Sequence, residues 1–165
     1  MIREMIKEDI AAVQHIARAT WKDTYTEILP EPVQQKFLDS AYSAPMLLKR
    51  MEKTEVLIAE YDHKPVGFFN MTRIDEDGDA ELTALYILPE YQRKGIGTEL
   101  FAGALSLLDG AMQLFVYVDD LNDPAKAFYE KLGFHLLEVF DEDFEGVAVE
   151  TAQYVYKLPQ PAICI

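Results

Sequence analysis

Hydrophobic and polar positions follow two different periods along this chain. Ile10, Val13, Ile16, Ala17 and Trp21 recur at spacings of three and four, which predicts an amphipathic helix over 8–21. Runs rich in β-branched and aromatic residues, bounded by turn residues, predict strands elsewhere. Further helices are expected over 33–42, 44–52, 95–109 and 123–133. Strands are expected over 1–6, in a hairpin over 56–74, over 80–88 and 112–118, and in a last hairpin formed by 134–140 and 147–158.

This order of elements predicts an α/β fold with a mixed sheet of six or seven strands and helices on both faces. A chain of 165 residues, half of them apolar, is large enough to bury one core and leaves little room for a second. No internal repeat and no Gly-, Ser- or Pro-rich linker interrupts it. We therefore expect a single domain over 1–165.

The charge balance narrows the class of partner. The formal charge is −14, from 29 acids against 15 bases, and this disfavours a nucleic-acid surface because phosphate contacts need clustered Lys and Arg. A small cationic partner fits better. The acids gather at 75–81, 118–123 and 141–145, and each cluster is read first as a solvated loop.

Other features of the sequence argue against a membrane protein, a disulfide framework and a metal site. No apolar run approaches the length that spans a bilayer, and the first ten residues carry charges where a signal peptide is apolar, so we expect a cytoplasmic protein without membrane partners. The single cysteine, Cys164, gives neither a disulfide framework nor a cysteine metal cluster, and it is not expected to be a nucleophile. His15, His63 and His135 lack metal-ligand spacing, so no metal site is expected.

The stretch Tyr91 to Leu100, YQRKGIGTEL, raises the most specific question. It does not match the phosphate loop GxxxxGK[ST], and it lacks the third glycine of GxGxxG. At a junction between strand and helix, however, it offers consecutive backbone N–H donors for an anion, with Arg93 and Lys94 beside them. Gly95 and Gly97 would let a pyrophosphate approach the backbone, although two glycines alone also fit a plain turn.

At this point the chain resembles the GNAT superfamily of N-acetyltransferases. The family's acetyl-CoA loop has the form (Q/R)xxGx(G/A), and here it reads QRKGIG from Gln92 to Gly97. The stretch ALYILPEYQRKGIGTEL resembles the family's strand and loop together, and NDPAKAFYEKLGF resembles its second motif about 25 residues later. The likeness covers nearly the whole chain. It implies a GNAT-like mixed, mostly antiparallel sheet and an enzyme that takes acetyl-CoA as co-substrate.

The resemblance also implies which residues hold acetyl-CoA. In this family the strand before the loop splays from its neighbour and pairs with the pantetheine arm, and a backbone N–H near Ile87 faces the thioester carbonyl. The matching positions here are Leu85, Tyr86, Ile87, Gln92, Arg93, Lys94, Gly95, Ile96, Gly97, Thr98, Asn122, Lys126 and Tyr129.

Tyr129 is the candidate acid. Asn122 and Tyr129 lie seven residues apart, close to two helical turns, so both can face the cofactor from one helix. By resemblance, Tyr129 donates a proton to the departing thiolate, which a phenol that stays protonated at pH 7 can do. Phe128 and Tyr129 could instead be packed core aromatics.

Glu81 is the candidate base, because removing a proton from an amine with a pKa near 10.4 costs about 4.6 kcal/mol at pH 7. Its even spacing from Leu85 and Ile87 predicts that all three side chains share one face of a strand. Related polyamine acetyltransferases often carry acids on this strand, sometimes two, and Thr83 stands at the second place here. Glu81 could also be an acid that simply ends the loop 75–81.

On the acceptor side, ATWKDTYTEILP resembles bacterial enzymes that acetylate polyamines. Trp21 and Tyr25, with Asp23 and Glu27, would supply aromatic and acidic groups for a cation, although a helical core explains Trp21 equally well. The expected reaction is direct transfer to the primary amine of a small, polyamine-like substrate. A protein N-terminus or lysine as acceptor, and a CoA-binding sensor without catalysis, remain alternatives. A homodimer is common in the family, and the tail 158–165 could contribute to it.

Overall fold

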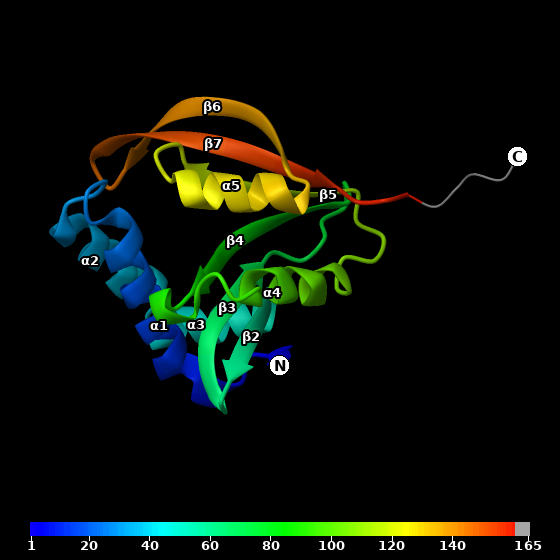
Figure 1. The fold of residues 1–165 in the computed structure, drawn as a ribbon, viewed down its shortest axis with the longest axis horizontal. Coiled ribbons are helices and arrows are strands. Elements are labelled where there is room, and N and C mark those ends of the chain that lie inside the picture. The colour runs from blue at the N-terminus through cyan, green and yellow to red at the C-terminus, as the bar shows by residue number, and fades with distance from the viewer. Residues whose placement is uncertain (161–165) are drawn as a thin grey trace, which may run out of the picture.

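The computed structural model describes residues 1–160, so Cys164 and most of the tail named above lie outside the described residues. Seven strands form one sheet in the order β1-β2-β3-β4-β5-β7-β6 (Figure 1). Neighbouring strands are antiparallel except β4 and β5, which run parallel. The predicted mixed, mostly antiparallel sheet is therefore confirmed. The strands are β1 (Ile2–Glu4), β2 (Glu55–Tyr61), β3 (Lys64–Met71), β4 (Asp79–Ile87), β5 (Gln113–Asp119), β6 (His135–Phe144) and β7 (Val147–Lys157).

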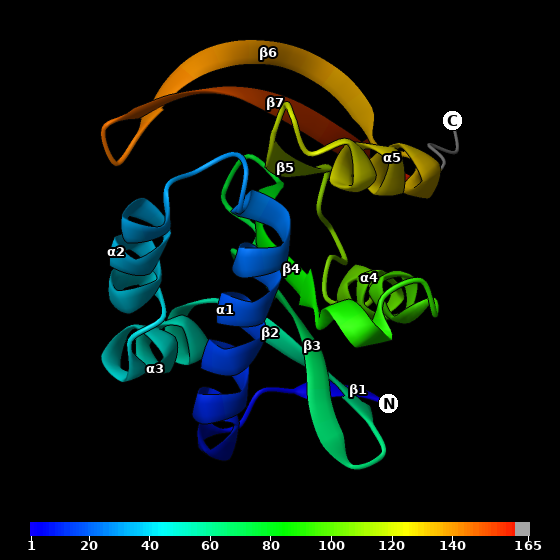
Figure 2. The same cartoon turned by 60° about the vertical axis from the view of Figure 1, so that its left-hand side comes forward.

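Helices cover both faces of the sheet, as predicted. Two views show α1, α2 and α3 on one side of strands β2 to β4 and α4 on the other side (Figures 1 and 2). Helix α5 lies beneath the long arc of β6 and β7 (Figure 1). The helices are α1 (Ile10–Tyr25), α2 (Glu31–Ala41), α3 (Ala44–Lys53), α4 (Ile96–Leu105) and α5 (Asp123–Leu132), with short 3₁₀ turns η1 (Lys7–Asp9) and η2 (Pro89–Tyr91).

The ends of α5 follow from its sequence. The Asn122 side chain accepts a hydrogen bond from the Ala125 N–H, Pro124 lies in the first turn, and Gly133 ends the helix with φ 107°. Helix α4 begins as expected after Gly95 but stops at Leu105 rather than near 109. The chain leaves the helix there through tighter turns, in which the Leu108 N–H donates to the Leu105 carbonyl, and it reaches a left-handed glycine at Gly110.

The acidic cluster 141–145 was expected to be a solvated loop, and this prediction was wrong. Asp141 to Phe144 continue β6 and pair with Val147 to Glu150 of β7. Acids are tolerated in this strand because β6 lies at the edge of the sheet, where Asp141, Glu142 and Asp143 stay exposed. The hairpin is long enough for its tip to reach α2, where Phe144 lies 5.1 Å from Phe37 between ring centres.

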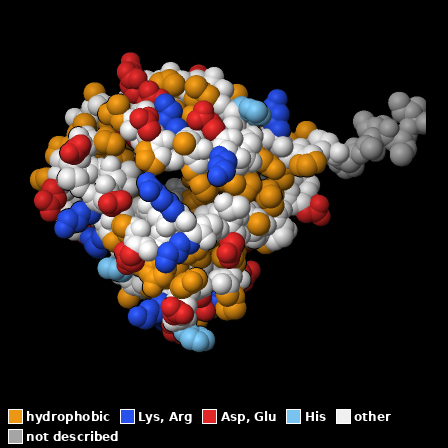
Figure 3. Space-filling view, viewed as in Figure 1, with side chains coloured by type: hydrophobic (Ala, Val, Ile, Leu, Met, Phe, Trp, Pro, Cys, Tyr) orange, Lys and Arg blue, Asp and Glu red, His pale blue; other side chains and the backbone are white. Residues whose placement is uncertain are grey.

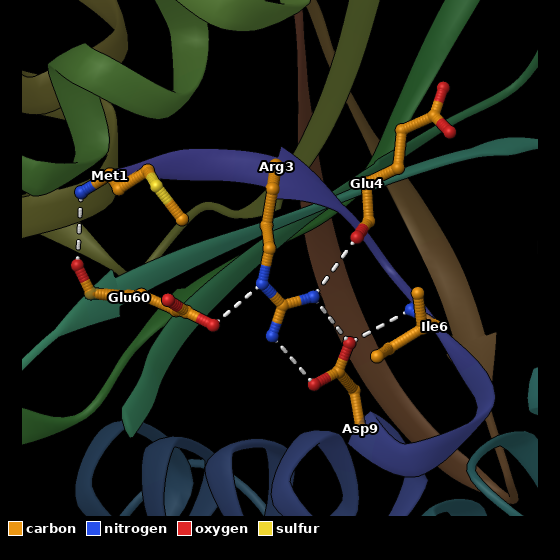
Figure 4. Close-up of polar contacts among 6 residues, drawn as sticks. All are labelled: Met1, Arg3, Glu4, Ile6, Asp9 and Glu60. Atoms are coloured by element: carbon orange, nitrogen blue, oxygen red, sulfur yellow. Dashed lines mark hydrogen bonds and ion pairs between the residues drawn. The ribbon is translucent and has the colours of Figure 1, made fainter. Parts of the chain in front are cut away.

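A partly buried ion pair fixes the start of the chain against the sheet. The Arg3 guanidinium donates to both Asp9 carboxylate oxygens at 2.8 Å and to Glu60 Oε1 at 2.6 Å (Figure 4). Asp9 also accepts the Ile6 N–H. Burial alone would raise the pKa of Asp9, but the bonds from Arg3 and Ile6 outweigh it and hold that pKa below the ordinary value of 3.8. Strand β1 and helix α1 are thereby joined.

We expect Asp9→Asn to lower the free energy of unfolding by about 1–3 kcal/mol at pH 7, because Arg3 loses a two-pronged charged partner. Asp39→Asn is the matched control, since the Arg18–Asp39 pair is exposed on both sides and should change stability by less than about 1 kcal/mol. Urea unfolding measures both.

The difference between wild type and Asp9→Asn should also depend on pH in one direction. The folded-state pKa of Asp9 is lowered, so its contribution is complete above the unfolded pKa and disappears as pH falls through the folded pKa. Equal stabilities at pH 7, or a difference that grows in acid, would contradict this role.

Candidate active site

Strands β4 and β5 separate in the middle of the sheet. Their parallel pairing covers Asp79 to Leu82 of β4 and Gln113 to Val116 of β5, and it ends there. Beyond that point β4 keeps β3 as its neighbour, while β5 keeps β7. We call the divergence of Thr83–Ile87 from Tyr117–Asp119 the split. It is the splayed arrangement that the resemblance implied.

The free edge of β4 exposes particular backbone groups to the split. The Leu88 N–H donates to the Val66 carbonyl of the β3 side at 2.8 Å. Because backbone groups of successive strand residues alternate in direction, those of Leu85 and Ile87 point the other way, toward the split. The Ile87 carbonyl already accepts hydrogen bonds from the side chains of Gln92 and Thr20. The Ile87 N–H and both Leu85 groups therefore face an incoming ligand.

A β-bulge changes which face Glu81 occupies. Phe69 and Met71 share one face of β3, and their partners are Leu85 and Leu82, which are three residues apart in β4. The alternation of β4 therefore shifts at the bulge, so Leu82 rather than Glu81 lies on the Leu85 face. The predicted common face for Glu81, Leu85 and Ile87 was wrong. Even spacing fails here because one extra residue lies between them.

Glu81 instead lies on the face of β4 opposite to Leu85, where it lines a hollow of about 210 Å³. Burial raises the pKa of its carboxyl. Thr83 contributes no acid, and its hydroxyl donates to the Asn70 carbonyl. The lining of the hollow comprises Thr72, Asp75, Asp79, Ala80, Glu81, Phe115 and Tyr117.

The glycine loop joins η2 to α4. Gly95 takes φ 81°, a left-handed conformation that suits glycine, and Arg93 takes φ 64° nearby. The first N–H groups of α4, at Ile96, Gly97 and Thr98, precede the first helical donor, Glu99. A small hollow opens between α5 and this loop, with Lys and Arg side chains on more than one side of it (Figure 3). In a protein of charge −14, this local basic rim suits an anion.

Gly97 brings the loop directly against α5. A Cβ atom at this position would lie 3.0 Å from Phe128 Cζ and 3.2 Å from Phe128 Cε1. The glycine is thus explained by helix packing as well as by access for a phosphate. Phe128, which is not among the predicted site residues, sets the spacing between the loop and α5. A glycine paired with an aromatic residue about 30 positions away gives no readable signal in one sequence.

Residues predicted on α5 have differing surroundings. Asn122 caps the helix by accepting from the Ala125 N–H, and its side chain acts to lower the pKa of Tyr25 against larger effects that raise it. Lys126 donates to Asp120 Oδ1 at 2.7 Å, so its charge is already paired. Tyr129 is 5% exposed, and burial, with a smaller effect of Tyr25, raises the pKa of its phenol. A buried, protonated phenol meets the requirement for a proton donor.

Aromatic side chains from α1, α2 and the C-terminal hairpin pack together where the acceptor side was expected. Trp21 is 5% exposed, stacks on Phe37 at 4.6 Å and donates its indole N–H to Tyr86 Oη at 3.0 Å. It is enclosed by protein rather than open to a ligand. The ring centres of Tyr25 and Trp21 lie 4.5 Å apart. Burial is the largest cause that raises the pKa of Tyr25 to about 12, and the charges of Asp119 and Tyr42 add to it.

Tyr42 and Tyr86 extend this cluster and were missed as side-chain contributors. The rings of Tyr42 and Tyr86 lie 6.4 Å apart between centres, and the Tyr42 ring lies 4.5 Å from the Arg50 guanidinium. Burial raises the pKa of both phenols, and that of Tyr86 lies well above its ordinary value. The cluster is neutral, and it lies on the α1 side of the split.

Comparison with known proteins decides what this arrangement is. A family model described as "Acetyltransferase (GNAT) family" matches residues 12–134, which include the split, the glycine loop and α5. The chain belongs to the GNAT acetyltransferase family. This GNAT protein is 30% identical to a spermidine N(1)-acetyltransferase of Thermoplasma acidophilum over 87% of the chain and 92% of the relative. It is 32% identical to an uncharacterized N-acetyltransferase, YuaI, of Bacillus subtilis over 90% and 86%.

A solved structure extends the match to a bound state. The PaiA N-acetyltransferase of Thermoplasma acidophilum, determined in complex with coenzyme A, superimposes with a TM-score of 0.82 at 29% identity, over 96% of this chain and 98% of that one. This GNAT chain is therefore an acetyl-CoA-dependent N-acetyltransferase with an amine acceptor. Among residues 1–160, no helix is both long and apolar enough to span a bilayer.

Gly97 and Phe128 allow a direct test of the loop packing. In the wild-type background, Gly97→Ala should lower the free energy of unfolding, because overpacking costs about 1–3 kcal/mol. In a Phe128→Ala background the same change should be neutral or stabilising, since alanine favours a helix by about 1 kcal/mol over glycine. A double-mutant cycle by urea unfolding measures the coupling. Additive effects would contradict the contact.

Proposed function

We propose that this enzyme moves acetyl from acetyl-CoA to the primary amine of a small, polyamine-like cation. Glu81 carries this proposal: its carboxyl has a raised pKa and lies where β4 and β5 still pair, two residues before the split begins at Thr83. The acids of its hollow, Asp75 and Asp79, suit further ammonium groups of such a substrate. The spermidine acetyltransferase among the relatives supports the same substrate class.

We assign the pantetheine arm to the free edge of β4 and the pyrophosphate to the start of α4. Leu85 and Ile87 offer backbone partners to the arm, and the Ile87 N–H suits the thioester oxygen as negative charge develops. Arg93 and Lys94, which are exposed beside the loop, complement the phosphates, whereas Lys126 first has to leave Asp120.

The transfer then needs three proton movements. Glu81 accepts a proton from the ammonium group, directly or through water, and the free amine attacks the thioester carbon. A C–N bond forms, the C–S bond breaks, and Tyr129 gives its proton to the departing sulfur. The new amide nitrogen loses its remaining extra proton, which restores the Tyr129 phenol. Because the pKa of Tyr129 is raised, the phenol is fully protonated at neutral pH before this step. Tyr25 and the neighbouring tyrosines bound the acceptor side, while Trp21 supports them from within the core.

A thiol-release assay with a matched panel of amines tests this proposal. Spermidine and spermine should exceed butylamine in kcat/KM by about tenfold or more, since each further ammonium gains a carboxylate partner. Tyr129→Phe should lower kcat by about 10²-fold while leaving CoA affinity nearly unchanged. Preference for a peptide N-terminus or lysine would overturn the substrate class. Background release with every amine, despite CoA binding, would indicate a sensor instead.

The pH profile tests Glu81 separately. As a base it must be ionised, so kcat/KM should rise with pH through a pKa above the ordinary 4.5 of a glutamate. Glu81→Gln should lower the rate by about 10²-fold and remove that acid limb. Asp141→Asn, an exposed acid on β6, serves as the control and should keep the parent profile. An unchanged acid limb in Glu81→Gln would remove Glu81 from the mechanism.

A further inference from the structure

The last residues of β4 have a strand neighbour on one edge only among the described residues. Thr83 to Ile87 lie beside β3, and their other edge faces the split. A strand end with one neighbour frays more readily than a strand with two, because fewer hydrogen bonds oppose its local opening. This end carries the backbone groups that we assign to the thioester, so its position has to be fixed by something other than a second strand.

Three side-chain hydrogen bonds from outside the sheet converge on this end. Gln92 Nε2 donates to the Ile87 carbonyl at 2.9 Å, and Thr20 Oγ1 donates to the same oxygen at 3.4 Å. Trp21 Nε1 donates to Tyr86 Oη at 3.0 Å. The donors come from the loop before α4 and from adjacent residues of α1.

Thr20 is an unusual member of this group. A threonine within a helix commonly bonds the carbonyl four residues before it in its own helix. The Thr20 hydroxyl is directed instead at β4, from a side chain that is only 7% exposed. This bond therefore spans two elements that are 67 residues apart in sequence.

These bonds also decide what Ile87 can offer a ligand. A carbonyl oxygen has two lone pairs, and Gln92 and Thr20 supply one donor for each. Ile87 is left with its N–H as the group that faces the split, so it acts as a donor only. On the opposite edge, the bond from the Leu88 N–H to the Val66 carbonyl holds the next residue.

We propose that Gln92 and Thr20 are positioning residues for acetyl transfer, which fix the direction of the Ile87 N–H through the Ile87 carbonyl. This assignment rests on the proposed function of the split. It gives Gln92 a role different from the direct cofactor contact expected of the loop motif. It also adds Thr20, which no motif indicated.

Steady-state kinetics of Gln92→Met and Thr20→Val test the assignment. Each change removes the donor and keeps a similar volume. Since the N–H acts on charge that develops in the transition state, we expect kcat to fall by about tenfold, with less than about threefold change in KM for acetyl-CoA. Thr20→Ser keeps the hydroxyl and should restore kcat. Gln35→Met is the control, because Gln35 bonds Asp39 on the exposed side of α2.

Amide hydrogen exchange without substrate gives a second readout that does not depend on turnover. In the Thr20→Val, Gln92→Met double variant, the Leu88 N–H should exchange about tenfold faster or more, because the strand end opens more often. Unchanged Leu88 exchange would overturn the assignment, as would a KM that rises while kcat stays constant. If the wild type transfers acetyl to no amine, the proposed function fails, and Leu88 exchange still decides whether these residues hold the strand.

Discussion

The separation of β4 from β5 after only four paired residues is the constraint on which the rest of the structure depends. Backbone N–H and C=O groups require partners, and the split leaves a row of them along Leu85 and Ile87 without a second strand. A ligand with amide groups can complete this edge as a strand would. The pantetheine arm of coenzyme A has such groups, and the site thereby needs no particular side chain at these positions.

The helices around the split supply the anion-binding groups and the side-chain contacts that the backbone edge of β4 does not provide. Helix α4 begins with free N–H donors beside Arg93 and Lys94, and the Gly97–Phe128 contact holds α5 close to this helix start. On the other face, α1 inserts Tyr25 toward Asn122 of α5 and fastens β4 through Thr20 and Trp21. The anion and the cationic acceptor can therefore approach from different elements. This separation suits a protein whose overall charge is strongly acidic.

Much of this arrangement could be predicted from the sequence, because nearby residues determine where the helices begin and end. The start of α5 after Asn122, its end at Gly133 and the start of α4 after Gly95 depend on local signals, and the structure has all three. The bulge that turns Glu81 to the opposite face was not predictable, since side-chain direction in a strand depends on the register with its neighbour. The bonds of Gln92 and Thr20 to Ile87, and the closure around Trp21, likewise join distant parts of the chain. The direct roles of Tyr129, Glu81, Lys126 and the loop residues in catalysis and binding stay predictions.

Hydrogen exchange of individual backbone amides, with and without coenzyme A, tests the central claim most directly. If the split is the pantetheine site and the start of α4 holds the pyrophosphate, coenzyme A should slow exchange at Leu85, Ile87 and the amides of Ile96 to Thr98. The amides along the free edge of β6 should be unaffected. Binding of coenzyme A with no protection at Leu85 and Ile87, or with protection confined to other strands, would contradict this account.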